Sequence, residues 1–195
     1  NCRYCNIGCE RPEPLDVDEP KHLAKAVSEL GLKYSVITSV TRDDLPDGGA
    51  NHFAQTIEEI RKISPDTKIE ILTPDFKGDK EALDTIIKAH PDVFNHNIET
   101  VERLFKTARP QGNYRRSLEV LKYIKENSDI PTKSGMMVGL GETQDDIKQT
   151  LADLRSVGCD ILTIGQYIQP SKQHLEVEKY YTEEDFIEDI ADKEV

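Results

Sequence analysis

The alternation of short apolar segments with amphipathic helical segments constrains the fold most strongly. Five apolar segments have the length of strands, and each interval between them is long enough for a helical crossover. Such alternation is typical of an α/β protein whose parallel sheet is covered by helices. A last helix is predicted to begin near residue 181, because Thr182 opens a sequence that resembles a capping box. The predicted strands are 34–40, 68–73, 92–97, 132–138 and 161–167, and the other predicted helices are 20–30, 50–63, 80–89, 116–125 and 144–157.

Length and charge limit the classes of function. The chain has 195 residues, enough for one domain with a substantial core, and its sequence contains no linker-like stretch. Its net charge of −12 disfavours phosphate backbones and anionic lipids, so neither nucleic acid nor a membrane is an expected partner. No signal-peptide or membrane-spanning pattern is apparent in these residues. We therefore expect a cytoplasmic protein whose thiols stay reduced.

Polar and glycine residues follow every predicted strand at the point where it ends. In an open α/β sheet and in a β/α barrel alike, the carboxyl ends of the parallel strands form the binding site. The alternation alone does not separate these two architectures. Polar groups at five strand ends nevertheless predict a polar ligand that is contacted from several sides. These groups lie in residues 38–49, 73–75, 95–99, 139–142 and 166–171.

Three cysteines occur within eight positions near the start of the sequence. Thiolates at Cys2, Cys5 and Cys9 could hold a soft metal or an iron-sulfur cluster and leave one coordination position open. Cys159 stands alone, and we interpret it as a small buried apolar residue. The spacing does not suggest a disulfide framework in a chain of this size.

Five sequence blocks resemble radical S-adenosylmethionine (SAM) enzymes, and four of them resemble the lipoyl synthase family in particular. The first, NCRYCN at 1–6, is similar to the last part of the Cys-x3-Cys-x2-Cys loop of the superfamily, so the resemblance places the first cysteine of that loop before residue 1. The other four occur in the family's order and cover most of the chain. They are ITSVTRDDLPDGGA at 37–50, PDVFNHNIET at 91–100, TKSGMMVGLGET at 132–143 and LTIGQYIQPS at 162–171.

The resemblance implies a particular fold and domain. The fold would be a partial (β/α)6 TIM-like barrel of the radical SAM type with its first strand missing. Residues 1–195 would form an incomplete radical SAM core domain, with the cluster loop at 1–10 and the barrel at 20–195. By this comparison the chain is truncated at both ends, and we expect that it does not complete turnover alone.

The resemblance also implies the cofactors, the reaction and the partners. Cys2 and Cys5 would bind a 4Fe-4S cluster, whose open iron binds SAM, and reductive cleavage of SAM would give a 5'-deoxyadenosyl radical. Cys9 lies beyond the family motif, where ligation is not implied. The family inserts two sulfur atoms into the octanoyl chain of an octanoyl-lysyl carrier protein, such as the H protein or an E2 lipoyl domain. It takes the sulfur from a second, auxiliary 4Fe-4S cluster, whose ligands resemble nothing here, and electrons from a donor such as flavodoxin or ferredoxin.

Several polar and glycine residues are candidates for binding SAM. An amide and a carboxylate at the end of the third predicted strand suit a ribose diol or an ammonium group, provided that the strand continues and turns both side chains to one side. Glycines after the fourth strand would allow adenine to approach the backbone. The remaining candidates would contact methionine, adenine or the cluster. The full set is Tyr4, Thr38, Ser39, Asn97, Glu99, Arg109, Lys133, Ser134, Gly139, Gly141, Glu142, Gln166 and Gln169.

Other interpretations of these features stay open. Asp43, Asp44 and Asp47 lack the spacing of a calcium loop, so we interpret them as residues that order a loop, with Arg42 as an ionic partner. The histidines lack the spacing of a zinc site. A radical SAM enzyme with a different substrate is one alternative function. A non-catalytic barrel that binds zinc or an iron-sulfur cluster is the other.

Overall fold

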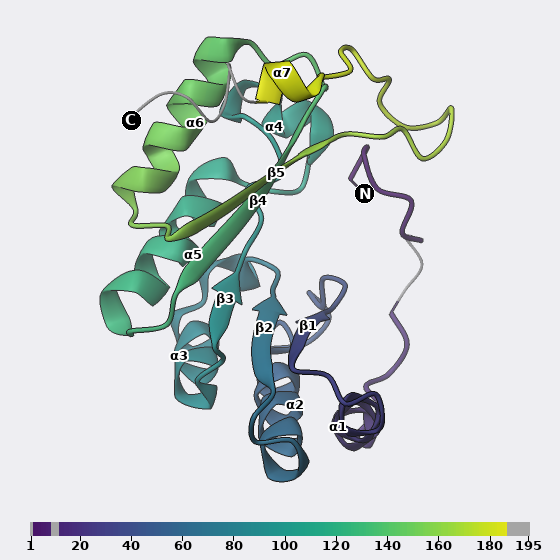
Figure 1. Ribbon diagram of the computed structural model, residues 1–195, viewed down its shortest axis with the longest axis vertical. Coiled ribbons are helices and arrows are strands. Elements are labelled where there is room, and N and C mark those ends of the chain that lie inside the picture. Colours follow the sequence, from purple (N-terminus) through teal and green to yellow (C-terminus); the bar gives the residue numbers. More distant parts are fainter. Residues whose placement is uncertain (1, 9–11, 187–195) are drawn as a thin grey trace.

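The computed structural model describes residues 2–8 and 12–186. Cys9, which we considered as a third ligand, therefore lies outside the described residues. Five strands form one sheet, and helices connect them in turn (Figure 1). The elements are α1 (Glu19–Glu29), β1 (Tyr34–Thr38), α2 (Ala50–Ile63), β2 (Lys68–Leu72), η1 (Phe76–Gly78), α3 (Lys80–Ala89), β3 (Val93–Asn95), α4 (Glu102–Ala108), α5 (Tyr114–Asn127), β4 (Thr132–Val138), α6 (Gln144–Ser156), β5 (Ile161–Gln166) and α7 (Glu183–Asp185).

The strand order supports the barrel over the doubly wound sheet. All neighbouring strands are parallel, and their spatial order β1-β2-β3-β4-β5 is the order of the chain. A doubly wound sheet reverses its order at a switch point, whereas a sheet that winds in one direction keeps its crossover helices on one face. The helices lie on the outer side of the curved sheet (Figure 1), as in part of a TIM-like barrel. This confirms the predicted fold class.

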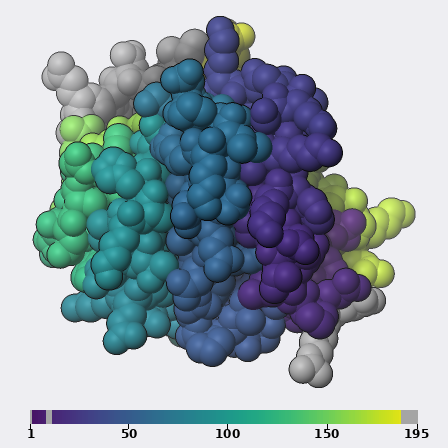
Figure 2. All heavy atoms as spheres, turned by 90° about the horizontal axis from the view of Figure 1, so that it is seen from below, coloured from purple at the N-terminus to yellow at the C-terminus, as the bar shows by residue number. Residues whose placement is uncertain are grey.

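The two faces of the sheet differ in burial because one faces the helices and the other faces the open lumen. Ile69, Ile71 and Phe94 point toward the helices and have 0% exposure. On the opposite face, Val36 and Ile161 are 52% and 42% exposed. The hydrophobic core therefore lies between the sheet and the helices. Figure 2 shows the helices α1, α2 and α3 packed side by side on the outer side of the molecule.

Local sequence explains where several helices begin. The Asp79 carboxylate accepts a hydrogen bond from the Glu81 N–H at the start of α3. Thr143 and Asp146 form a capping box at the start of α6, and Thr182 and Asp185 form another at α7. Such caps satisfy backbone N–H groups that have no partner in the first turn of a helix.

The sequence-based assignment missed two short elements, η1 and α4. No side chain caps the N-terminus of α4, which has only seven residues. The third strand is shorter than predicted and ends at Asn95, while α5 is longer than predicted by two residues at each end. Within residues 2–8 and 12–186, no helix has both the length and the apolar character needed to cross a membrane.

Candidate cofactor site at the carboxyl ends of the strands

The loop that carries Cys2 and Cys5 is held against the end of α4 and the segment after β5. The Arg3 N–H donates to the Ala108 carbonyl at 2.8 Å, and the Arg3 carbonyl accepts from the Leu175 N–H at 2.9 Å. The Cys5 carbonyl accepts from His174 Nε2 at 3.1 Å. These contacts place the segment of residues 2–8, the cysteine loop, at the edge of the sheet where the strands end, beside the segment that follows β5 (Figure 1).

The donor set at this edge fits part of an iron-sulfur site. Cys2 and Cys5 are both free thiols and are only partly buried. Thiolate sulfur is the ligand that iron-sulfur clusters take in proteins. Within residues 2–8 and 12–186, no group of three or more His, Cys, Asp or Glu side chains could hold a metal ion. The described residues therefore fit two of the thiolate ligands of a cluster, and a third would have to come from elsewhere.

The backbone after β3 brings Glu99 close to the cysteine loop. Glu99 has φ +69°, which is uncommon and costly for a residue other than glycine. Its N–H donates to the Gly135 carbonyl at 2.9 Å, and its carbonyl accepts from the Met137 N–H at 2.8 Å. The strand ends at Asn95, so the condition under which we expected strand alternation to turn both side chains to one side is not met. Asn97 and Glu99 come together because of an irregular turn that is bonded to β4.

Three of the predicted site residues surround the Glu99 carboxylate. Burial raises the pKa of Glu99, while the Arg109 guanidinium and hydrogen bonds from the Asn97 and Tyr4 side chains act in the opposite direction. Burial, and then the charges of Glu99 and Cys2, raise the pKa of Tyr4 far above its usual value. A partly buried carboxylate beside a thiol loop can bind a cationic or hydroxyl group, because both donate hydrogen bonds to it.

Gly135 in β4 lies directly opposite Asn97, and the sequence-based analysis missed this residue. A Cβ atom at Gly135 would lie 2.7 Å from Asn97 Oδ1 and 3.1 Å from Thr163 Oγ1. A side chain at position 135 would force the Asn97 amide to shift. A glycine inside a strand is the signal that could have identified it.

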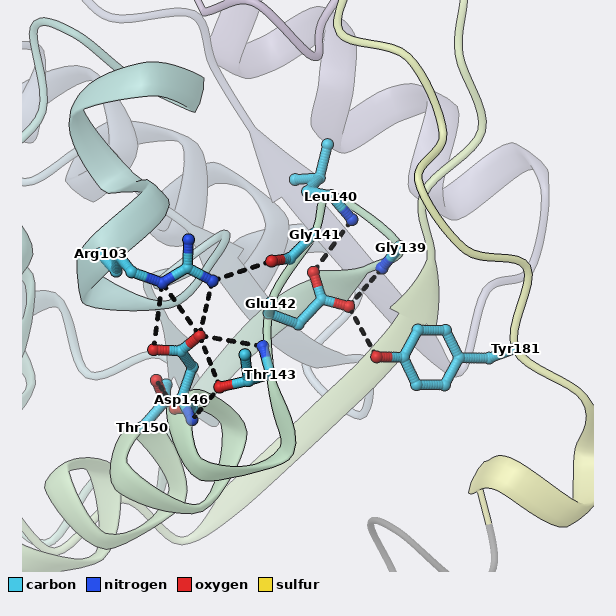
Figure 3. A network of polar contacts seen from close by, with 9 residues as sticks. All are labelled: Arg103, Gly139, Leu140, Gly141, Glu142, Thr143, Asp146, Thr150 and Tyr181. Carbon is cyan, nitrogen blue, oxygen red and sulfur yellow. Dashed lines mark hydrogen bonds and ion pairs between the residues drawn. The ribbon is translucent and has the colours of Figure 1, made fainter.

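The loop after β4 takes its shape from the Glu142 carboxylate (Figure 3). Gly139 and Gly141 have φ of +104° and +96°, which side chains strongly disfavour. The Glu142 carboxylate accepts from the Gly139 and Leu140 N–H groups at 2.6 and 2.9 Å, and from the Tyr181 hydroxyl at 2.8 Å. Both Glu142 oxygens thus bind groups of the protein. Glu142 therefore organises the segment of residues 139–142, which we call the glycine loop. Its carboxylate binds backbone N–H groups of that loop.

Arg103 of α4 fixes the other side of the same loop. Its guanidinium donates to the Gly141 carbonyl at 2.8 Å and pairs with Asp146 at 2.7 Å (Figure 3). This pair, together with the hydrogen bonds from Thr143, lowers the pKa of Asp146 to about 2. The loop is therefore connected to α4, α6 and the segment after β5.

Two predicted glutamines are used to hold the segment that follows β5. The Gln166 amide donates to the Tyr167 and Lys179 carbonyls and accepts from the Tyr181 N–H at 2.9 Å. The Gln169 amide donates to the His174 carbonyl at 3.0 Å. These amides bind the protein backbone at the mouth of the barrel, whereas we had expected them to face adenine or substrate.

Lys133 and Ser134 lie on opposite faces of β4. Ser134 has 0% exposure on the face toward the helices, and its Oγ accepts from the Ile98 N–H at 3.0 Å. A contact between Ser134 and a ligand in the lumen does not fit this position. Lys133 faces the lumen but is paired with Glu70 at 3.0 Å, below the strand ends. Thr38 and Ser39 are exposed at the end of β1, where a ligand could reach them.

A polar network on the lumen face was not predicted. The Glu70 carboxylate binds Lys133, the Tyr34 hydroxyl at 2.5 Å and Asn95 Nδ2 at 2.8 Å. Asn95 Oδ1 is buried and has no hydrogen-bond partner. A charged residue at the centre of the apolar strand β2 was the available signal, since such residues are rarely buried unless they are paired.

The acidic loop after β1 behaves as the sequence suggested. Arg42 forms two hydrogen bonds with Asp44, at 2.9 and 2.8 Å. The Asp47 carboxylate accepts from the Gly49 and Asn51 N–H groups at the start of α2. Arg42, Asp44 and Asp47 therefore order the loop, in agreement with our interpretation of these three residues.

Comparisons with known proteins match a superfamily model and several lipoyl synthases. The family model of the Radical SAM superfamily matches residues 1–154. A lipoyl synthase from Caldanaerobacter subterraneus subsp. tengcongensis is 53% identical over 187 residues, which are 95% of this chain and 66% of that protein. A lipoyl synthase from Rubrobacter xylanophilus is 54% identical, again over 95% of this chain and over 58% of that protein. The chain thus spans about three fifths of the length of the curated relatives it matches.

A solved structure supports the fold without bearing on the substrate. Streptococcus suis SuiB bound to S-adenosylmethionine aligns with a TM-score of 0.70 at 15% identity and covers 92% of this chain and 40% of SuiB. At this identity the likeness concerns the fold alone.

Proposed function

Because this chain belongs to the radical SAM superfamily, we propose that it is the core domain of a lipoyl synthase. The observation that carries the proposal is the identity of 53% and 54% to two lipoyl synthases over 95% of the chain. The domain comprises residues 1–195, with the cluster loop at 1–10 and the barrel at 20–195. The proposed reaction inserts two sulfur atoms into the octanoyl chain of an octanoyl-lysyl carrier protein.

The proposal gives the residues at the strand ends separate tasks. Cys2 and Cys5 bind the 4Fe-4S cluster, which together with bound SAM would supply the reductive cleavage of the sulfonium. The Glu99 carboxylate and the Asn97 amide accept hydrogen bonds from SAM, and Arg109 balances the Glu99 charge, as the pKa effects at Glu99 support. The glycine loop gives adenine access to backbone groups, because Gly139 and Gly141 carry no side chains.

The remaining candidates support the site in other ways. We propose that Tyr4 covers the cluster and that Thr38 and Ser39 bind the methionine part of SAM. Burial of the reacting groups within the barrel would exclude water, and a radical reaction requires this exclusion.

Further parts of the reaction lie beyond these residues. We propose that the complete protein supplies the third cysteine of the loop and an auxiliary 4Fe-4S cluster as the sulfur source. The carrier would be an H protein or an E2 lipoyl domain, and the electron donor a flavodoxin or ferredoxin. We place the protein in the cytoplasm, where its thiols would stay reduced.

The test uses the full-length protein, reconstituted with iron and sulfide without oxygen. With SAM, dithionite and an octanoyl-lysine peptide, we expect 5'-deoxyadenosine and a peptide that has gained two sulfur atoms and lost two hydrogens, both measured by mass spectrometry. The Cys5→Ala variant should form neither product. The matched control is Cys159→Ala. Cys159 lies two residues before β5, at the edge of the sheet where the strands begin, so this variant should leave both products unchanged.

Two outcomes would contradict the proposal in different ways. Formation of 5'-deoxyadenosine without any lipoyl product would indicate a radical SAM enzyme with another substrate. A colourless protein that binds zinc and does not respond to dithionite would indicate a structural metal site. If Cys5→Ala still cleaves SAM, the assignment of the cluster ligand is wrong.

A further inference from the structure

The segment from Ser171 to Tyr181, which we call the strap, connects two parts of the site that are far apart in sequence. At one end, the Leu175 N–H donates to the Arg3 carbonyl of the cysteine loop at 2.9 Å. At the other end, the Glu178 N–H donates to the Gly139 carbonyl at 2.8 Å, and the Tyr181 hydroxyl donates to Glu142 at 2.8 Å. One segment thus binds both the cysteine loop and the glycine loop.

The strap has its own anchor on the end of β5. The Tyr167 hydroxyl donates to the Leu175 carbonyl at 2.8 Å, and the Tyr167 ring is 2% exposed. Leu175 and Val177 pack against the apolar cluster that contains Tyr167, and Tyr4 of the cysteine loop packs against the same cluster. The strap therefore sits on a small apolar cluster, which fixes its height above the strand ends.

His174 makes the most direct contact between the strap and a proposed cluster ligand. Its ring bridges Ser171 Oγ, at 2.8 Å from Nδ1, and the Cys5 carbonyl, at 3.1 Å from Nε2. A carbonyl oxygen can only accept, so Nε2 must carry a proton and donate. In the neutral ring Nδ1 then accepts from the Ser171 hydroxyl. This hydrogen-bond pattern defines both the tautomer and the orientation of the ring.

We propose that His174 is a positioning residue, which orients the backbone at Cys5 and thereby aligns the cluster with the glycine loop. The proposal rests on the proposed function, because it takes Cys5 as a cluster ligand. A hydrogen bond to the Cys5 carbonyl restricts the peptide that follows Cys5. Restricting that peptide limits the directions in which the Cys5 thiolate can point. Because the strap also binds the glycine loop through Glu178 and Tyr181, it holds the glycine loop in a fixed position relative to the cysteine loop.

The first test needs no cluster and no activity. Hydrogen exchange of the full-length apo protein is compared for wild type, His174→Ala, His174→Gln and a control, His90→Ala. His90 is an exposed residue at the end of α3, at the opposite edge of the sheet. We expect His174→Ala to raise exchange in the peptide spanning residues 2–8 about fivefold, the factor for one net hydrogen bond. His174→Gln should restore protection, because its Nε2 can still donate, and His90→Ala should change nothing in that peptide.

The second test examines the cluster itself. In the reconstituted protein, His174→Ala should keep its iron content but alter the EPR spectrum of the reduced cluster and weaken the spectral change on addition of SAM. His174→Gln should resemble wild type in both respects.

The outcomes separate this inference from the proposed function. Unchanged exchange in residues 2–8 of His174→Ala would overturn the positioning role. So would an increase spread evenly over the sheet, which would indicate a general folding role. If the wild-type protein does not cleave SAM, the proposed function is refuted, but the effect of His174 on hydrogen exchange in residues 2–8 still stands.

Discussion

Replacing Lys133 by methionine tests whether the polar network on the lumen face stabilises the sheet. The Glu70 side chain is 2% exposed and the Lys133 side chain is 21% exposed, and the Lys133 ammonium lies 3.0 and 3.2 Å from the two carboxylate oxygens. Methionine keeps most of the volume of lysine but removes its charge. The buried Glu70 carboxylate then loses its cationic partner.

The expected cost follows from what remains around Glu70. Removing one partner of a buried ion pair costs about 3–5 kcal/mol. The Tyr34 hydroxyl and the Asn95 amide still donate to the carboxylate in the variant, so we expect about 3 kcal/mol, the lower end of that range. An exposed control, Lys122→Met, breaks a pair with Glu126 on the surface of α5 and should cost less than about 0.5 kcal/mol.

Urea unfolding at pH 7 measures both variants, and a double-mutant cycle with Glu70→Gln isolates the pair. We expect the double variant to be more stable than the sum of the single effects predicts, by at least about 1.5 kcal/mol. If the two single effects add to within about 0.5 kcal/mol, the two side chains are not coupled and the reasoning fails.

The pH dependence gives an independent check of the same pair. Burial pushes the pKa of Glu70 upward, but hydrogen bonds from Tyr34, Asn95 and Lys133 outweigh it and hold the pKa below its usual value. A lowered pKa stabilises the fold above the unfolded pKa of about 4.3, and the contribution is lost as the pH falls through the folded pKa. Without Lys133 this pKa rises. The stability gap between wild type and Lys133→Met should therefore narrow as the pH falls from 7 toward 4.

Three further changes test separate features. Gly135→Ala should destabilise the fold by about 1–3 kcal/mol in urea unfolding, because the new methyl group lies 2.7 Å from Asn97 Oδ1; a neutral effect would mean that Asn97 moves freely. Glu142→Gln should cost about 1–3 kcal/mol and raise hydrogen exchange in the glycine loop, since an NH2 group replaces one acceptor of the loop N–H groups; equal exchange in both proteins would contradict this. Burial lowers the pKa of His96 to about 4, so wild type should lose stability as the pH falls from about 6.5 to 4, whereas His96→Gln should lose less over that window; parallel pH profiles would refute it.

The pattern of the sequence predicted the repetitive part of the fold well, and the physical reason is periodicity. The predicted helices 50–63 and 80–89 and the predicted strand 132–138 have the bounds of α2, α3 and β4. Each of these elements buries one face, so its apolar residues recur at the period of the element. Short elements carry too few residues to show a period, which explains why α4 was missed.

The candidate site was predictable as a set of residues but not as a set of contacts. Cys2, Tyr4, Asn97, Glu99 and Arg109 do come together. Whether they bind SAM or a cluster stays a prediction.

The errors in the candidate site have a common cause, which is that the direction of a side chain depends on backbone detail. The chain pairs with β4 at Asn95, the last residue of β3, and again at Glu99. An irregular turn lies between these two positions. Ser134 faces the helices and not the lumen, because only every second residue of β4 points toward the lumen. The amides of Gln166 and Gln169 bind the Lys179 and His174 carbonyls of the strap, contacts that the sequence pattern did not predict.

The stability of the site should differ from that of the sheet, because different kinds of contact hold them. The sheet rests on fully buried side chains such as Ile71 and Phe94. The cysteine loop and the strap rest on one small apolar cluster and on hydrogen bonds. One of these hydrogen bonds joins residues 169 positions apart in the sequence. Segments with few buried apolar contacts open at a lower free energy than the core does. A mild denaturant should therefore loosen the cysteine loop and the strap together, while the sheet stays folded, and hydrogen exchange would show whether these two segments open as one unit.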